Sequence, residues 1–294
     1  MSKLTNILKK RTLKAQYLSK ADLKTYDTLK RESKSHEAKV TCMGLYNHGK
    51  SSLLNALIDD LDCQTFKTAD VRETSKNKSF KAKHFTYVDT PGLNAQTFDD
   101  KRVMEAVKSS DLNIFVHNVN TGEFVAKEME FFQQIKTYWK NPKQFIERTL
   151  FVLSRIDEAN HAEDIEATAQ KMHKQIQHVF QANATIIPVS AMDYLLGRKE
   201  NEEELVQISH IPDLQSMLMQ RHQQYQSSVQ ADKQARFDRY RNQMMQKLNA
   251  KYQKKLLSLS QTVQAQKEWA KNLEQDIERI QHTLKQKEQM LREV

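Results

Sequence analysis

The chain has 294 residues, of which 28% are charged, and a formal net charge of +9. This length allows one or two domains, and the two cysteines, Cys42 and Cys63, are too few for a disulfide or zinc framework. No apolar run approaches the length of a membrane span and the N-terminus lacks a signal-peptide core, so we expect a cytoplasmic protein, with peripheral membrane binding left open.

Glycine and proline divide the chain into three parts. All five glycines and all four prolines lie between residues 44 and 212, so nothing in either flank interrupts a helix. We therefore predict helical arms at 1–36 and 213–294 around a central α/β domain at 37–212, with a mostly parallel sheet flanked by helices. The arms carry net charges of +7 and +6 and leave −4 for the centre. Basic arms can meet anionic lipid, nucleic acid or an acidic partner, and charge alone does not choose among them.

The N-terminal arm has the pattern of a basic amphipathic helix. Lysines and Arg11 lie between its apolar positions, so the helix can rest on an anionic bilayer. The alternative, which we favour, is that the apolar face packs on the C-terminal helices. The apolar stripe consists of Leu4, Ile7, Leu8, Leu13, Tyr17, Leu18, Leu23, Tyr26 and Leu29.

Residues 44–51 read Gly-Leu-Tyr-Asn-His-Gly-Lys-Ser and match the pattern G-x-x-x-x-G-K-[S/T] between a β-branched run and a helical run. In this phosphate loop, the glycines let successive backbone N–H groups point at phosphate oxygens beside a helix N-terminus. Lys50 then reaches the outer phosphates and Ser51 offers its hydroxyl to Mg²⁺. The motif therefore predicts a binding site for a nucleoside triphosphate. The residues expected to bind it are Gly44, Asn47, His48, Gly49, Lys50, Ser51 and Ser52.

An alternating run at 83–88 leads into Asp89-Thr90-Pro91-Gly92-Leu93. Asp89, at the C-terminal end of this predicted strand, can hold the Mg²⁺ shell opposite Ser51, and the N–H of Gly92 can sense a γ-phosphate. The alternative is an ordinary Pro-Gly turn, which the phosphate loop upstream makes the poorer explanation.

Two later strand ends resemble the guanine-reading motifs N/T-K-x-D and S-A-x of the GTPase superfamily. They are Ser154-Arg155-Ile156-Asp157 after the run 149–153, and Ser190-Ala191-Met192 after the run 185–189. The carboxylate of Asp157 would accept from the ring N1–H and the exocyclic amine of guanine, and the N–H of Ala191 would bond the guanine carbonyl oxygen. Adenine presents an acceptor at N1, and paired bonds of this kind reject the wrong analogue by roughly 10⁴ or more.

Together these segments, over residues 38–192, resemble the translation-factor-related class of GTPases, nearest to the Era-like and bacterial dynamin-like branches. The resemblance implies Mg²⁺-dependent hydrolysis of GTP to GDP and phosphate. Ser154 replaces the Asn or Thr that normally ties this loop to the phosphate loop, and Arg155 replaces a Lys whose stem covers the base. Arginine can still stack there, so we expect weaker affinity with specificity kept by Asp157.

The resemblance also bears on catalysis. Leu93 occupies the place where Ras-like enzymes carry a water-orienting Gln, so another group must position the water. Asn47 matches the asparagine that in potassium-dependent members holds a monovalent cation against the phosphates; alternatively, Asn47 only shapes the turn. Thr74, 24 residues after Lys50, is the first candidate for the Mg²⁺-binding threonine of switch I, ahead of Thr68 and Thr65.

Residues 245–294 fit a heptad repeat, with twelve of fifteen core positions apolar. As one helix they would extend about 75 Å, which a compact domain cannot cover alone. The segment must fold into a hairpin, pair with another chain or meet the N-terminal arm, and we expect a homo- or hetero-oligomer through these helices. The core positions are Asn249, Leu256, Val263, Ala270, Ile277, Leu284 and Leu291, and Met245, Tyr252, Leu259, Gln266, Leu273, Ile280, Lys287 and Val294.

Three functions compete. The first is a small dynamin-like GTPase whose arms relay the nucleotide state to a membrane or protein partner. The second is an Era-like factor whose basic helices bind RNA or ribosomes, which is disfavoured because the chain has no recognisable RNA-binding module. The third is a scaffold that binds GTP without hydrolysing it, although all the phosphate-handling residues are intact.

Overall fold

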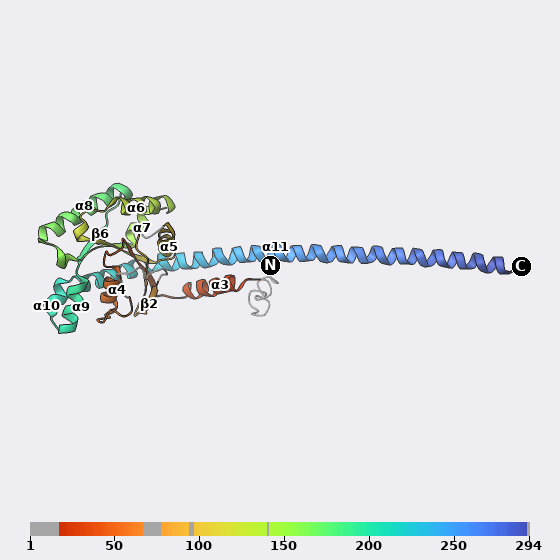
Figure 1. Cartoon of the computed structure of the whole chain (residues 1–294), viewed down its shortest axis with the longest axis horizontal. Helices are drawn as coiled ribbons and strands as arrows, with labels where there is room; N and C mark the ends of the chain where they lie inside the picture. Colours follow the sequence, from red (N-terminus) through yellow and green to blue (C-terminus); the bar gives the residue numbers. More distant parts are fainter. Residues whose placement is uncertain (1–17, 67–77, 94–96, 140, 293–294) are drawn as a thin grey trace. The chain divides into compact units, whose positions relative to one another are not determined.

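The computed structural model describes residues 18–66, 78–93, 97–139 and 141–292 (Figure 1). Two compact units make up the chain: unit 2 is Ser35–Asp232, and unit 1 combines the residues before and after it. Unit 2 thus begins near the domain start predicted after residue 36. It ends at Asp232, some twenty residues beyond the domain end predicted at 212. Thr74 and Thr68, two of the candidate Mg²⁺ ligands of switch I, lie outside the described residues.

Unit 2 is built on a six-stranded sheet in the order β2-β3-β1-β4-β5-β6. β2 runs antiparallel to β3, and every other neighbouring pair is parallel, which confirms the predicted fold class. The strands are β1 (Ala38–Gly44), β2 (Lys78–Ala82), β3 (Phe85–Asp89), β4 (Leu112–Asn118), β5 (Thr149–Ser154) and β6 (Thr185–Val189).

Helices cover both faces of this sheet because side chains alternate along each strand. In β5, Leu150 and Val152 enter one hydrophobic core, and Phe151 and Leu153 enter the other. The first core is completed by α4 (Lys50–Ile58), α9 (Ala191–Glu200), α10 (Glu203–Ile208) and the start of α11 (Ile211–Arg292). The second core is completed by α5 (Thr97–Lys108), α6 (Ala126–Tyr138), α7 (Pro142–Glu147) and α8 (Ala162–Phe180). Figure 1 shows α6, α7 and α8 grouped on one side of the sheet.

The parallel strands bring the predicted motifs to one edge of the sheet. β1 ends at Gly44, β3 at Asp89, β5 at Ser154 and β6 at Val189. Because the carboxyl ends of parallel strands meet at the same edge, the segments that follow them converge there. Motifs that are far apart in the sequence therefore lie close together in unit 2.

Unit 1 pairs α3 (Lys20–Glu32) with the part of α11 that begins at Lys233. Ser19 caps α3 by accepting from the backbone N–H of Asp22 at 3.0 Å. The Tyr26 ring lies 5.3 Å from that of Phe237, and Lys247 pairs with Asp22 at 3.3 Å. The described part of the N-terminal stripe thus packs on the C-terminal helix, as we favoured. The buried apolar residues of this contact are Leu18, Tyr26, Phe237, Met244 and Leu248.

Beyond Leu248, α11 continues as one helix to Arg292, so no hairpin forms within the described residues. From residue 249 onward every described side chain is exposed, including the heptad-core residues Leu256, Leu259 and Ile280. In the described part of the chain, no helix has both the length and the apolar composition needed to span a bilayer.

Candidate functional site

The phosphate loop joins β1 directly to α4. Gly44, the last residue of β1, has φ +148°, and a Cβ there would lie 2.2 Å from the carbonyl oxygen of Val116 in β4. No side chain fits in that gap, so glycine is required where the loop leaves the sheet. Asn47 and Gly49 both adopt left-handed backbone conformations, with φ values of 60° and 80°. Asn tolerates a positive φ better than most other residues. The backbone of Asn47 therefore supports the alternative that this residue shapes the turn.

Lys50 begins α4 and is 8% exposed. Its Nζ donates to the carbonyl oxygen of Leu45 within the loop at 2.7 Å. Burial lowers the pKa of Lys50, while the carboxylate of Asp89 opposes that shift. The hydrogen bond to Leu45 holds the ammonium against the phosphate loop, where phosphate oxygens would also lie.

Ser51 and Asp89 meet beside Lys50. The Ser51 hydroxyl donates to Oδ2 of Asp89 at 2.9 Å. Asp89 is 2% exposed, and its Oδ1 has no hydrogen-bond partner among the described residues. Burial raises the pKa of Asp89, and the Lys50 ammonium opposes the rise. Mg²⁺ prefers oxygen ligands. The Ser51 hydroxyl and Oδ1 of Asp89 are such ligands, so these two residues fit the predicted ion.

Gly92 and Leu93 lie against the phosphate loop. A Cβ on Gly92 would come within 2.7 Å of the Tyr46 backbone nitrogen, so only glycine permits this close approach. The backbone N–H of Leu93 donates to the Gly44 carbonyl at 3.1 Å, and its side chain is 1% exposed in the second core. Leu93 is therefore a core residue and cannot orient a water molecule, as its side-chain chemistry predicted.

A cavity of about 280 Å³ opens beside the end of the phosphate loop. It brings together three segments that sequence analysis assigned to one ligand: the phosphate loop, the residues after β5 and the residues after β6. Its lining residues are Gly49, Ser52, Leu53, Ser154, Arg155, Asp157, Glu158, Val189, Ala191 and Met192.

The candidate base-reading residues line this cavity. Asp157 lies on the short 3₁₀ helix Ile156–Glu158, while the neighbouring Arg155 pairs with Glu158 at 2.9 Å. Ala191 is the first residue of α9, after the cap Ser190, whose hydroxyl accepts from the backbone N–H of Asp193 at 3.0 Å. The first N–H groups of a helix have no acceptor within it, so the Ala191 N–H is available to a ligand carbonyl.

Ser154 does tie its loop to the phosphate loop. Its buried hydroxyl lies 2.8 Å from the His48 carbonyl oxygen and 3.0 Å from the His117 carbonyl oxygen, and it donates toward both. Ser154 therefore makes the link to the phosphate loop that Asn or Thr normally makes at this position. The effect on affinity stays a prediction.

Ser154→Ala is expected to lower the free energy of unfolding by about 1–2 kcal/mol and to weaken GDP binding, because it removes a buried hydrogen bond between two loops. Thermal unfolding and GDP titration measure these effects. Ser228→Ala is the control, since it removes an exposed hydroxyl that accepts from Arg148. Equal unfolding midpoints for Ser154→Ala and the wild type would contradict the assignment.

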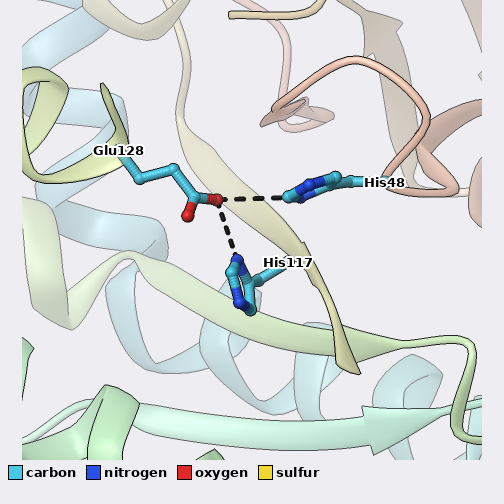
Figure 2. Close-up of side chains that lie close together, drawn as sticks. All are labelled: His48, His117 and Glu128. Carbon is cyan, nitrogen blue, oxygen red and sulfur yellow. Dashed lines mark hydrogen bonds and ion pairs between the residues drawn. The ribbon is translucent and has the colours of Figure 1, made fainter. Parts of the chain in front are cut away.

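His48 faces two residues that sequence analysis did not single out, His117 in β4 and Glu128 in α6 (Figure 2). The three lie on separate elements with no recognisable spacing. Only the position of His48 inside the phosphate loop pointed toward this place in the fold.

Comparison with known proteins shows what part of the chain is similar to. Residues 39–155 match the family model described as 50S ribosome-binding GTPase. An uncharacterised protein of Acinetobacter baylyi is 38% identical over 122 residues, which make up 40% of this chain. The chain spans only 28% of the length of that relative.

Two solved structures show the same fold. Toc33 from Arabidopsis thaliana, in a dimerisation-deficient mutant, has a TM-score of 0.51 and 16% identity over 70% of this chain and 94% of its own. LeoA, a bacterial dynamin GTPase from ETEC, has a TM-score of 0.50 and 17% identity over 77% of this chain and 43% of its own. At such identities the likeness concerns the fold alone.

Proposed function

We propose that this protein binds GTP and hydrolyses it to GDP and phosphate with Mg²⁺, and the match of residues 39–155 to a GTPase family model supports the proposal. The observation that carries the proposal is the convergence of the phosphate loop, Asp157 and Ala191 on one cavity. The sheet topology brings these segments to one edge, and the side-chain types that line the cavity there suit the phosphates and the base of one nucleotide.

Each part of the site has a role in this reaction. The backbone N–H groups of the phosphate loop and the Lys50 ammonium bind the phosphates and stabilise charge that develops during transfer. Ser51 and Asp89 would hold Mg²⁺, which neutralises charge on the phosphate oxygens. Asp157 and Ala191 read the guanine edge, and Gly92 offers its N–H near the outer phosphate.

Calorimetry on the magnesium-loaded protein tests binding, and release of phosphate from GTP tests hydrolysis. We expect heat with GDP and with a non-hydrolysable GTP analogue, and none with the adenine nucleotides. Phosphate should appear with GTP but not with ATP. Absence of heat with both guanine nucleotides would overturn the proposal. Binding without phosphate release would instead make the protein a GTP-dependent scaffold.

Potassium is a finer part of the same proposal. If Asn47 holds a monovalent cation against the phosphates, GTP turnover is expected to be faster in potassium than in sodium buffer, and Asn47→Ala should remove the difference. Because Asn47 has a positive φ of 60°, Asn47→Gly is the matched control that keeps the turn but not the amide. Equal turnover in both salts would leave Asn47 with a turn-shaping role only.

For the arms, we propose that the exposed stripe of α11 pairs with a second copy of the chain in antiparallel orientation. Leucine and isoleucine side chains in this stripe are 41–60% exposed, a solvent exposure that pairing would remove. Residues 247–255 contain four lysines and no acid, whereas residues 274–278 contain three acids and no base. Antiparallel pairing places the basic segment beside the acidic one, while parallel in-register pairing places like charges together.

Two leucines give this proposal a matched pair of variants. Leu259 is a heptad-core residue and is 60% exposed, and Leu257 lies outside the core and is 61% exposed. Leu259→Glu is expected to convert the dimer to a monomer in sedimentation or light-scattering measurements, whereas Leu257→Glu is expected to leave it intact. The same mass for both variants would contradict pairing through this stripe.

We further propose that nucleotide state is relayed through the arms to an anionic membrane or a protein partner. The ribosome is the second candidate, because the matching family model is described as ribosome-binding and both arms are basic. GTP turnover with anionic vesicles, with neutral vesicles and with ribosomal RNA separates them. Stimulation by anionic vesicles alone supports the membrane, and stimulation by RNA alone supports the ribosome.

A further inference from the structure

Three buried side chains converge behind the phosphate loop (Figure 2). His48 belongs to the loop itself, His117 to β4 and Glu128 to the first turn of α6. His117 and Glu128 are fully buried, and His48 is 6% exposed. The rings of the two histidines are nearly perpendicular, with centroids 5.3 Å apart.

Both rings use their far nitrogen on the protein backbone. Nε2 of His117 lies 2.8 Å from the Gly122 carbonyl oxygen, a contact that requires a proton on Nε2. The His48 ring is hydrogen-bonded to the backbone of Val116, and its Nδ1 has no hydrogen-bond partner among the described residues. In neutral imidazoles with these tautomers, Nδ1 of each ring is an acceptor.

The two Nδ1 atoms point at the same carboxylate oxygen. Oε1 of Glu128 lies 2.9 Å from Nδ1 of His117 and 3.7 Å from Nδ1 of His48. The other oxygen, Oε2, accepts from the backbone N–H of Val125 at 3.1 Å, which holds the carboxylate in place. Three acceptor atoms therefore meet in a buried space, and their lone pairs repel unless a cation lies among them.

One proton does not satisfy all three acceptors. A proton between His117 and Glu128 joins that pair and leaves Nδ1 of His48 alone. Nδ1 of His48 lies 3.7 Å from Oε1 of Glu128, which is too far for a hydrogen bond, so a proton on either atom does not join them. An unpartnered buried acceptor of this kind destabilises the fold unless a cation binds it.

We propose that Nδ1 of His48, Nδ1 of His117 and a carboxylate oxygen of Glu128 bind a divalent transition-metal ion, with Zn²⁺ as the reference ion. Two imidazoles and one carboxylate are a donor set that suits Zn²⁺ rather than the all-oxygen preference of Mg²⁺. The three ligand atoms lie within 4.8 Å of one another, so bonds of about 2.0–2.1 Å require only a small inward movement. The backbone acceptors on the far ring nitrogens are the outer partners that metal-bound histidines commonly have.

Metal binding changes the protonation of the cluster. A proton held between His117 and Glu128 would leave to solvent as the metal takes its place, so binding of each ion is expected to release one proton. Because His48 lies between Asn47 and Gly49, the bound ion would clamp the phosphate loop to β4 and α6. The site rests on the geometry of these three side chains and not on the proposed hydrolysis of GTP.

Metal titration of the chelator-treated full chain tests the site, in the presence of Mg²⁺ and GDP to keep the nucleotide site occupied. We expect one equivalent of Zn²⁺ to bind, with release of one proton, and Co²⁺ to give the visible absorption of a site with nitrogen ligands. His117→Gln and Glu128→Gln are expected to abolish the absorption, while His178→Gln, on the surface of α8, should leave it unchanged.

A second measurement covers the case in which these variants do not fold. X-ray absorption of the zinc-loaded wild type is expected to show two imidazole nitrogens and one oxygen at about 2.0–2.1 Å. Absence of a stoichiometric ion, or a shell without imidazole, would overturn the proposal. Nucleotide binding by the metal-free protein is measured in parallel, so a failed metal site and a failed nucleotide site give different results.

Discussion

Lys50→Ala is expected to weaken binding of GDP and GTP by about 30-fold or more, enough to abolish their retention during purification. The ammonium lies at the start of α4 and is held 2.7 Å from a carbonyl oxygen of the phosphate loop, where phosphate oxygens would replace that acceptor. Losing a charged partner of a desolvated anion costs about 2–5 kcal/mol, which corresponds to a loss of roughly 30-fold to several thousandfold. Equilibrium titration with a fluorescent GDP derivative measures the change.

Lys127→Ala is the control for this variant. Lys127 lies on α6 and forms an exposed ion pair with Glu130, so its removal changes the net charge by the same amount as Lys50→Ala. Circular dichroism and thermal unfolding of the nucleotide-free proteins show whether both variants are folded. A folded Lys50→Ala protein that binds GDP as tightly as the wild type would contradict the assigned role of Lys50.

The sheet and the place of the nucleotide site were predictable from sequence because both depend on local patterns. A β-branched run, a glycine-rich loop and a helical run at 39–58 identify a strand, a turn and a helix without any long-range information. Once the strands are parallel, the residues after each of them must share one edge of the sheet. Asp89 and Asp157 are brought there by topology alone.

The features that escaped sequence analysis depend on distances that no spacing encodes. Ser154 is the last residue of β5 and is paired with Asn118 of β4. This position in the sheet, and not its spacing in the sequence, brings its hydroxyl to the phosphate loop. His48, His117 and Glu128 lie on a loop, on a strand and at the start of a helix. Each residue type is common in its own element, so nothing in the sequence indicates that the three form a cluster. Glu128, for example, also caps its own helix through Val125.

Asp157→Asn is expected to shift base choice from guanine toward xanthine, with a change in the GTP-to-XTP preference of about 10³-fold or more. The carboxylate would accept from two donors of guanine, N1–H and the exocyclic amine. An asparagine amide offers one acceptor and one donor group, and the donor then faces the guanine amine. Xanthine carries a carbonyl oxygen in place of that amine, so the amide pairs with both of its groups.

The adjacent Glu158 gives this experiment its control. Glu158 lines the same cavity but is engaged by Arg155 at 2.9 Å and by Asn120 at 2.7 Å. Glu158→Gln is therefore expected to keep the preference for GTP over XTP, although it removes an equal charge one residue away. Competition of GTP, XTP and ATP for the labelled site measures the preference in both variants. If Asp157→Asn discriminates between the three nucleotides as the wild type does, the base lies elsewhere, and the cavity beside the phosphate loop serves another purpose.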